Sequence, residues 1–362
     1  MIMTGLRGVG KTVLLNRFAE LAEMAGWESI ELEASKHDET AFRQSIFSKF
    51  RAALLHISPR RRWSERARHA AEVLSSFVLS IDQSGTFSVT WDVDPSEGYG
   101  DHGDLGLDLT DVFLAVGEVA KEKGTGIVLL IDEVQFLTTV QLESLIQAVH
   151  KSVQKKLPIT FVGAGLPQIA ELAGDAKSYA ERLFQFPRID SLTPEEARQA
   201  LVGPAETENV SYDEDAVDLA VNLTHGYPYF IQELGYQAWI VANGNRITAE
   251  DISIAKEAYE AKLDGSFFRV RLDRATPLQT AYMRAMAELG SEPQKAADVA
   301  SLMKRESSQV APIRSQLIDM GLLYTPQHGY AAFTVPDFDK FMMRAVPRLE
   351  VPEIHYRRRR GK

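Results

Sequence analysis

The chain has 362 residues, 45% of them hydrophobic, and a formal net charge of −10 at pH 7. A chain of this length can bury the cores of two or three domains, while its acidic balance excludes a general binder of polyanions and leaves only local contacts with nucleic acid. Cysteine is absent, which excludes disulfides, thiolate zinc sites and cysteine nucleophiles. Because no apolar run approaches about 18 residues and no signal-peptide pattern opens the chain, we expect a soluble cytoplasmic protein without a membrane partner.

The first predicted element is a short apolar strand at residues 1–4, which leads into the motif GLRGVGKT and then into apolar residues at helical spacing. Gly5, Gly10, Lys11 and Thr12 fit the pattern G-x-x-x-x-G-K-[ST]. Backbone N–H groups of such a loop surround phosphate oxygens at the positive end of the following helix. We expect Lys11 to reach the β- and γ-phosphates and the Thr12 hydroxyl to ligate Mg²⁺. The residues expected to bind the nucleotide are Gly5, Leu6, Arg7, Gly8, Val9, Gly10, Lys11, Thr12 and Val13.

A second, acidic motif distinguishes a nucleotide site from an ordinary glycine turn ahead of a helix. Residues 127–131 form an apolar run, typical of a parallel strand covered on both faces, and the run ends in Asp132 and Glu133. We expect Asp132 to bind Mg²⁺ through water, and Glu133 to orient and deprotonate the attacking water. Alone such a run is commonplace, but after a phosphate-binding loop it indicates an ATPase.

Further strand patterns, with helical patterns between them, occur at residues 27–35, 157–167 and 183–189. Together with the two strands above, this β-α-β series predicts an α/β fold built on a parallel, doubly wound, five-stranded sheet. Between the second and third strands we expect an insertion that contains a β-hairpin, around residues 77–106. The predicted core ends at residue 192.

The second half of the chain predicts two smaller domains. Residues 193–265 carry helical patterns, opened by a capping box and interrupted by a Gly-Tyr-Pro elbow, and predict a helical lid. Three helical segments and two strands follow, at residues 276–290, 295–304, 307–324 and 325–335. Their order is typical of a winged helix-turn-helix domain, assigned to residues 266–345, with residues 307–320 as its recognition helix. A basic tail, residues 346–362, ends the chain.

The chain resembles the AAA+ P-loop ATPases of the origin-recognition and STAND-related group, and closely resembles a bacterial ATP-binding family with a C-terminal winged helix. The stretches that carry the resemblance are GLRGVGKTVLLNRFAELAE, LLIDEVQFL, VGAGLPQIAELAGDAKSYAERLF, GYPYFIQELG, DGSFFRVRLDRATPLQ and HGYAAFTVPDFDKFMMR. The resemblance implies an AAA+ core with ATP and Mg²⁺ as cofactors, and a possible homo-oligomer. AAA+ domains also carry a segment ahead of the first strand that covers the adenine, so we expect weak ATP–GTP discrimination or a start upstream of Met1.

Position by position, the resemblance leaves gaps. The fourth strand ends in residues 163–165, Gly-Ala-Gly, where the AAA+ pattern has a polar residue that positions water, and no arginine stands in the lid elbow. His225 and Pro228 of that elbow are candidate nucleotide sensors, although the elbow tyrosines are equally explained as lid core. Arg182 precedes the fifth strand, where an arginine finger would reach a neighbouring subunit, and an ordinary surface ion pair is the alternative.

Two functions therefore stay open. One is an ATP-binding, ATP-hydrolysing AAA+ switch that couples its nucleotide state to the winged helix and acts on double-stranded DNA. The other is a STAND-like signalling switch whose winged helix docks a protein, with slow or no turnover. The winged-helix region from Arg271 to Arg344 holds nine basic and eight acidic residues, so DNA affinity would depend on the arginines at 357–360, which are otherwise a solvated end.

Overall fold

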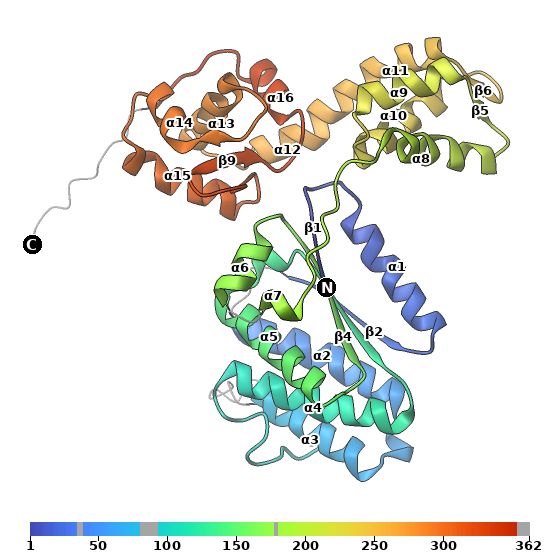
Figure 1. The fold of residues 1–362 in the computed structure, drawn as a ribbon, viewed down its shortest axis with the longest axis vertical. Coiled ribbons are helices and arrows are strands. Elements are labelled where there is room, and N and C mark those ends of the chain that lie inside the picture. The colour runs from blue at the N-terminus through green and yellow to red at the C-terminus, as the bar shows by residue number, and fades with distance from the viewer. Residues whose placement is uncertain (35–38, 80–92, 177–179, 353–362) are drawn as a thin grey trace, which may run out of the picture. The chain divides into compact units, whose positions relative to one another are not determined.

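A computed structural model describes residues 1–34, 39–79, 93–176 and 180–352 (Figure 1). Internal contacts divide the chain into two units, and each is described by itself. The first unit comprises Met1–Gly5 with Gly10–Ile189, and the second comprises Leu6–Val9 with the chain from Asp190 onward. The middle of the phosphate-loop motif is therefore grouped with the second half of the chain.

The first unit is built on a parallel sheet of four strands, in the order β1-β4-β3-β2. These strands are β1 (Ile2–Thr4), β2 (Glu28–Glu33), β3 (Ile127–Asp132) and β4 (Ile159–Gly165). Asp132 at the end of β3 lies opposite Glu33 at the end of β2 in the strand register. The central position of β3 explains its unbroken apolar run, since both of its faces are covered.

The predicted fifth strand is wrong: residues 183–189 form no strand in the structure. The segment runs beside β1 and makes one isolated bridge, between Thr4 and Arg188. It accepts hydrogen bonds from the N–H groups of Ile2 and Thr4, but Pro187 has no N–H to return, so a regular ladder cannot continue through it. The sheet therefore has four strands.

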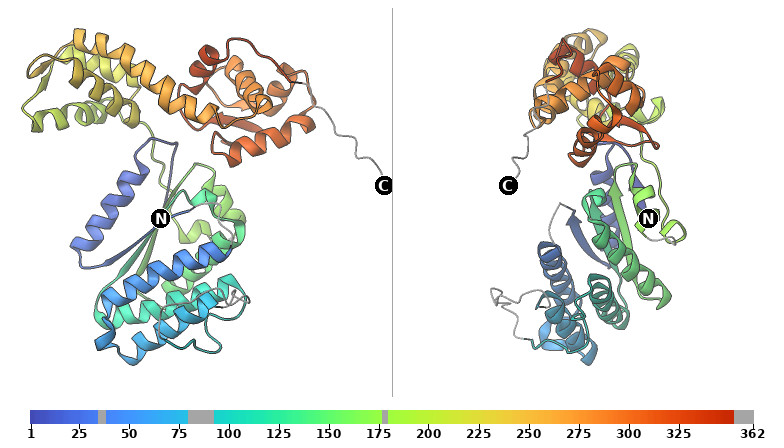
Figure 2. Two further views of the ribbon diagram at one scale, coloured as in Figure 1. Left: turned by 180° about the vertical axis from the view of Figure 1, so that it is seen from behind. Right: turned by 90° about the vertical axis from the view of Figure 1, so that its left-hand side faces the viewer.

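Helices cover both faces of this sheet (Figure 2). Alternate residues of the strands divide between two cores: Val128 and Leu130 of β3 pack with Leu15 of α1, whereas Leu129 and Ile131 belong to the larger core on the other face. The helices of the unit are α1 (Lys11–Met24), α2 (Glu39–Ile57), α3 (Glu65–Leu79), α4 (Leu105–Lys123), α5 (Thr139–Gln154), α6 (Ile169–Ala176) and α7 (Ala180–Leu183), with short 3₁₀ turns at Arg60–Arg62 and Val134–Phe136.

The hairpin expected around residues 77–106 falls mostly on residues 80–92, which lie outside the described part of the chain. At the two ends of that range the structure has helix, because α3 continues to Leu79 and α4 begins at Leu105. A buried ion pair joins α2 and α4: an Arg43 guanidinium nitrogen lies 2.9 Å from a carboxylate oxygen of Asp108, and both side chains are at most 2% exposed. This pair holds α2 against α4.

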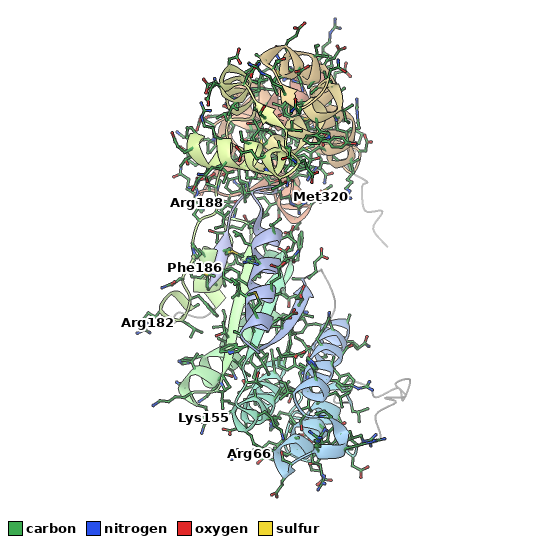
Figure 3. The ribbon with its side chains drawn as sticks, turned by 90° about the vertical axis from the view of Figure 1, so that its right-hand side faces the viewer. Arg66, Lys155, Arg182, Phe186, Arg188 and Met320 are labelled. Carbon is green, nitrogen blue, oxygen red and sulfur yellow. The ribbon has the colours of Figure 1, made fainter. Side chains whose placement is uncertain are left out.

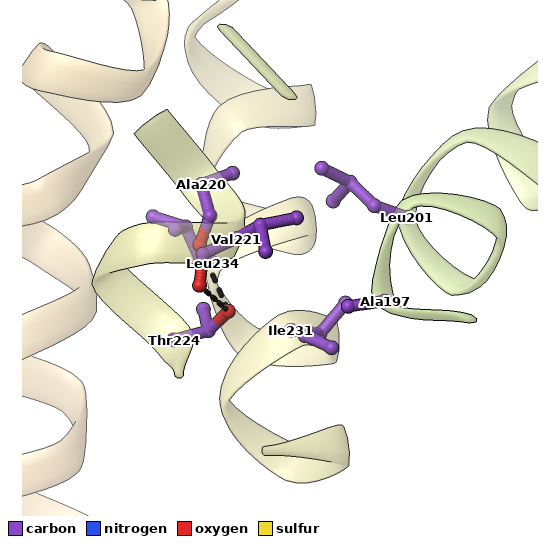
Figure 4. A pocket seen from close by; sticks show the side chains of 7 residues that line it. All are labelled: Ala197, Leu201, Ala220, Val221, Thr224, Ile231 and Leu234. Atoms are coloured by element: carbon purple, nitrogen blue, oxygen red, sulfur yellow. Dashed lines mark hydrogen bonds between the residues drawn. The ribbon is translucent and has the colours of Figure 1, made fainter. Parts of the chain in front are cut away.

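The second unit begins with four helices, α8 (Pro194–Thr207), α9 (Glu214–Thr224), α10 (Pro228–Val241) and α11 (Ala249–Lys262), and a two-stranded sheet of β5 (Ser211–Tyr212) and β6 (Arg246–Ile247). The predicted capping box is present, since Thr193 and Glu196 each bond the other's backbone N–H. An apolar pocket lies between these helices (Figure 4), lined by Ala197, Leu201, Ala220, Val221, Thr224, Ile231 and Leu234. It has no room for a water molecule, so it belongs to the packed core of these helices.

A continuous helical stretch joins α11 to the C-terminal elements. After α11 the chain passes through a π-helix (Leu263–Phe268) into α12 (Arg269–Leu272). The remaining elements are α13 (Pro277–Leu289), β7 (Gln294–Lys295), α14 (Ala296–Leu302), α15 (Ser307–Asp319), β8 (Leu323–Tyr324), β9 (Tyr330–Phe333) and α16 (Phe338–Ala345). Strands β7, β9 and β8 pair in that order. The helices α13, α14 and α15 and the hairpin of β8 and β9 thus occur in the order expected from the sequence. Within the described ranges, no helix is long and apolar enough to cross a membrane.

Candidate nucleotide-binding site

The loop between β1 and α1 has the conformation that its glycines permit. Gly8 and Gly10 adopt φ values of +87° and +92°, which lie in the left-handed region that other residues avoid. Lys11 begins α1 and is 7% exposed, and its Nζ donates a 3.0 Å hydrogen bond to the Gly5 carbonyl oxygen. The ammonium is thereby held against the start of the loop, where an anion would be bound.

Thr12 and Asp132, from α1 and β3, come together although 120 residues separate them. The Thr12 hydroxyl donates to Asp132 Oδ2 over 2.6 Å, and Asp132 Oδ1 accepts the N–H of Glu133 over 2.8 Å. Hydroxyl and carboxylate oxygens are the ligands that Mg²⁺ prefers, and it is usually held by few carboxylates together with substrate phosphates. In the described part of the chain no group of three His, Cys, Asp or Glu side chains could hold a metal by itself. The donor set therefore fits a Mg²⁺ that arrives with a nucleotide.

Glu133 follows Asp132 directly and has a left-handed backbone, with φ at +53°. Its carboxylate accepts a hydrogen bond from Gln135 Nε2, and Gln135 Oε1 in turn accepts the N–H of Leu166 over 3.0 Å. The sequence reasoning missed Gln135. The only signal for it was a polar residue in the otherwise apolar stretch that follows the two acidic residues.

A groove of about 230 Å³ lies beside the Thr12–Asp132 pair, between α1 and β2. Its lining comprises Thr12, Leu15, Asn16, Glu31, Leu32, Glu33, Leu130 and Asp132. The groove brings two further carboxylates, from β2, to the edge at which Asp132 lies.

Within the second unit, the loop residues from Leu6 to Val9 contact the elbow between α9 and α10. The Gly8 carbonyl accepts the N–H of Tyr229 over 3.2 Å, and a Cβ added to Gly8 would lie 3.2 Å from the Tyr227 ring. Tyr227 is 2% exposed, and burial raises the pKa of its phenol. Tyr227 is thus part of the packed core of this segment, and both elbow tyrosines are neighbours of the loop.

The other predicted residues lie on helices or at their ends. His225 is exposed at the end of α9, with φ at +50°, and Pro228 is the first residue of α10. The Val13 side chain is 66% exposed on α1. Arg182 is exposed on the short helix α7 (Figure 3), where its guanidinium is open to an approaching molecule.

Two family models match parts of the chain. Residues 1–170 match a family described as an AAA domain, and residues 265–342 match a domain of unknown function (DUF8462). A comparison with curated proteins gave no match.

Among solved structures, the Walker-type ATPase PABY2304 of Pyrococcus abyssi is similar with a TM-score of 0.58 at 16% identity, over 94% of this chain and 90% of that one. The Aeropyrum pernix ORC1 protein in complex with DNA (TM-score 0.42, 16% identity, 96% and 86% covered) and the Thermotoga maritima RuvB Holliday junction branch migration motor (TM-score 0.44, 14% identity, 97% and 87% covered) are more distant. These two likenesses are too weak to carry an argument about this chain.

The class of protein follows from the sheet, the loop and these matches. The chain has an α/β fold of the AAA+ P-loop type, and residues 1–170 match the model of an AAA domain.

Proposed function

We propose that the chain is an ATP-binding and ATP-hydrolysing switch, with turnover that is slow. The observation that carries this proposal is the 2.6 Å pairing of the Thr12 hydroxyl with Asp132, beside a buried lysine. A glycine loop, a lysine and this oxygen pair are the parts that bind a triphosphate and its metal. ATP and Mg²⁺ are the proposed cofactors.

Each residue then has one task. Lys11 leaves the Gly5 carbonyl and neutralises the β- and γ-phosphates, while Thr12 and Asp132 hold Mg²⁺, which supplies positive charge where the leaving phosphate becomes more negative. Glu133 takes the proton of the attacking water as that water meets the γ-phosphate. Lys11 therefore governs binding and Glu133 governs only the chemical step.

This division gives the test. Lys11→Ala should weaken ATP binding on the order of 10²-fold or more in equilibrium dialysis, because the phosphates lose their main cation. Glu133→Gln should keep binding within about twofold but lower phosphate release by roughly 10² or more, because it removes only the base. Lys155→Ala, at the exposed end of α5, is the control and should change neither. Equal hydrolysis by the wild type and Glu133→Gln would overturn the role of Glu133.

We further propose that the nucleotide state acts on a winged helix formed by α13 to α15 with β8 and β9. The Tyr229 N–H, one residue beyond Pro228, donates to the Gly8 carbonyl of the phosphate loop. A movement of the Gly8 carbonyl on nucleotide binding would displace the first turn of α10. This contact is therefore our proposed route by which the elbow of His225 and Pro228 senses the nucleotide. The segment from α11 through the π-helix to α12 would transmit the movement to the winged helix.

Double-stranded DNA is the partner that we propose first. On α15, Ser308 is exposed and Arg314 is half-buried, and Lys304 is exposed at the turn before the helix. Such side chains can contact base edges and phosphates. In a domain with nearly balanced charge, most of the affinity must come from the arginines at 357–360, so binding should fall steeply with salt.

A protein partner is the second candidate, and one set of observations favours it. Gln309 Oε1 accepts the N–H of Glu306, and Gln316 Oε1 accepts Gln279 Nε2 over 2.9 Å. Arg305 donates to the carbonyl of Pro352. Three polar side chains of α15 and of the turn before it are thus already bonded within their own unit, which leaves fewer of them to contact DNA.

Retention of random duplex DNA on a filter, at low salt and with or without ATP, separates the two candidates. If DNA is the partner, deleting residues 355–362 should weaken binding to all sequences alike, whereas Arg314→Ala should mainly reduce preference among sequences. Lys340→Ala, on α16, is a charge-matched control. Absence of retention with and without ATP would leave the protein-docking switch.

A further inference from the structure

We propose that Gln135 is a positioning residue for ATP hydrolysis, which holds the Glu133 carboxylate and ties it to the end of β4. The proposal rests on the hydrolytic function proposed above and names a part of the same site. AAA+ enzymes place a polar side chain at the end of the fourth strand, where this chain has Gly163, Ala164 and Gly165. Gln135 reaches this place from the 3₁₀ turn after β3.

Both ends of the Gln135 amide are engaged, and the two bonds run to different elements. Nε2 donates to Glu133, two residues earlier, and Oε1 accepts the N–H of Leu166 just beyond β4, over 3.0 Å. Because the Leu166 N–H needs an acceptor, the amide oxygen faces β4 and its NH₂ group faces the carboxylate. A glutamine is thus used as a donor and an acceptor at once.

The end of β4 is shaped to admit this amide. A Cβ added to Gly165 would lie 2.8 Å from Gln135 Oε1, which is closer than such atoms approach. The absence of side chains at Gly165 therefore makes room for the glutamine. Gln135 thus occupies space next to Gly165, one of the residues at which the sequence lacks the polar side chain of the AAA+ pattern.

Among the described residues, the Glu133 side chain has Gln135 as its hydrogen-bond partner. Its backbone is left-handed, with φ at +53°, a conformation that costs a non-glycine residue energy. Its N–H is bonded to Asp132 and its carbonyl accepts the N–H of Phe136. These bonds fix the backbone only, so the side chain depends on Gln135 for its direction, and a misplacement of about 1 Å at a catalytic group can cost on the order of 10² in rate.

The test compares two glutamines that lie close together in the chain. Gln135→Ala should lower kcat on the order of 10²-fold and leave KM and the ATP dissociation constant within about twofold. Gln141 is buried, and its side-chain oxygen accepts the Thr138 N–H in the capping box of α5. Gln141→Ala should therefore lower the melting temperature and leave kcat close to that of the wild type.

Three further measurements separate positioning from general loss of structure. Gln135→Glu has the same shape but no donor, and should lose kcat as Gln135→Ala does. Gly165→Ala should lower kcat with Gln135 intact, since the new methyl displaces its oxygen. In a Glu133→Gln background, Gln135→Ala should cost little more, because residues that act as a unit are non-additive. Hydrogen exchange at the Leu166 amide should rise in Gln135→Ala whatever the turnover.

The outcomes are distinguishable from a failure of the proposed function. A wild type that hydrolyses ATP, together with a Gln135→Ala variant of unchanged kcat, overturns the role of Gln135 and leaves the ATPase standing. The role is also overturned if Gln135→Ala lowers kcat by the same factor in the Glu133→Gln background as in the wild type. A wild type that binds ATP without turnover overturns hydrolysis, and with it any positioning role for Gln135.

Discussion

Gly226 illustrates how a single residue decides the path of the chain between α9 and α10. Its φ is +68°, and a Cβ at this position would lie 2.3 Å from the carbonyl oxygen of Leu192. The two residues are also joined by a hydrogen bond, in which the Leu192 N–H donates to the Gly226 carbonyl over 2.8 Å. The glycine is required by its conformation and by a backbone neighbour that has no freedom to retreat.

We expect Gly226→Ala to destabilise the protein by roughly 3 kcal/mol or more, since it combines a left-handed alanine with a backbone clash. Gly244→Ala is the matched control: Gly244 has φ at +90° and nothing within 4 Å of an added Cβ. That variant should lose only about 1–2 kcal/mol, from conformation alone. Urea unfolding curves of the two variants measure the difference, and equal losses would mean that the contact with Leu192 has no energetic weight.

At the scale of elements, the loop before α4 is bonded to the first turns of that helix. The His102 imidazole lies 2.9 Å from an Asp111 carboxylate oxygen, which also accepts the N–H of Gly100. The hydrogen bond to Asp111 is the main cause of a raised pKa at His102, with smaller contributions from the charges of Asp108 and Asp101. Protonation of this histidine therefore fastens the loop to the helix.

A raised pKa in the folded state means that the folded protein binds the proton more tightly than the unfolded chain. The stabilisation is complete below the ordinary histidine pKa of about 6.5 and is lost as the pH rises through the higher folded value. We expect the melting temperature of the wild type to exceed that of Asp111→Asn clearly at about pH 5.5, and by less at about pH 8.5. Glu118→Gln, farther along α4, removes the same charge and should show no such change. A difference independent of pH would contradict this account.

Elements whose signals are local were predictable from the sequence. The phosphate loop, the run of β3 and the capping box at Thr193 each depend on residues within a few positions of one another. The fifth strand was not predictable in the same way, because its apolar residues suggested pairing and Pro187 prevented the ladder. Gln135 was missed for another reason: its partner at Leu166 is 31 residues away, and no spacing rule connects the two.

At the scale of the whole molecule, contacts divide the chain into two units, and the phosphate-loop motif contributes residues to each of them. Leu6–Val9 belong by their contacts to the second unit, whereas Lys11 and Thr12 belong to the first. The proposed switch rests on the general principle that a bound nucleotide stabilises whichever state of the protein it contacts better.

A dependence of ATP hydrolysis on self-assembly can be tested through Arg182. Arg182 is exposed on α7, and we propose that it acts as an arginine finger at the γ-phosphate of a neighbouring copy, where a guanidinium stabilises the charge of the transition state. Specific ATPase activity should then rise with protein concentration. Arg182→Ala should lose on the order of 10³ in kcat, whereas Arg66→Ala, which removes an exposed arginine from α3, should lose little.

Mixing two inactive variants gives the decisive measurement. Lys11→Ala cannot hold ATP but still presents Arg182, and Arg182→Ala holds ATP but lacks the finger. A mixed assembly contains interfaces in which an intact loop meets an intact arginine, so phosphate release should return to a substantial fraction of the wild-type rate. The same mixture made with a Lys11→Ala, Arg182→Ala double variant should stay inactive, because no intact arginine is then present. Turnover that is independent of concentration, in a protein that sediments as a monomer, would rule out the finger and leave Arg182 as a surface residue.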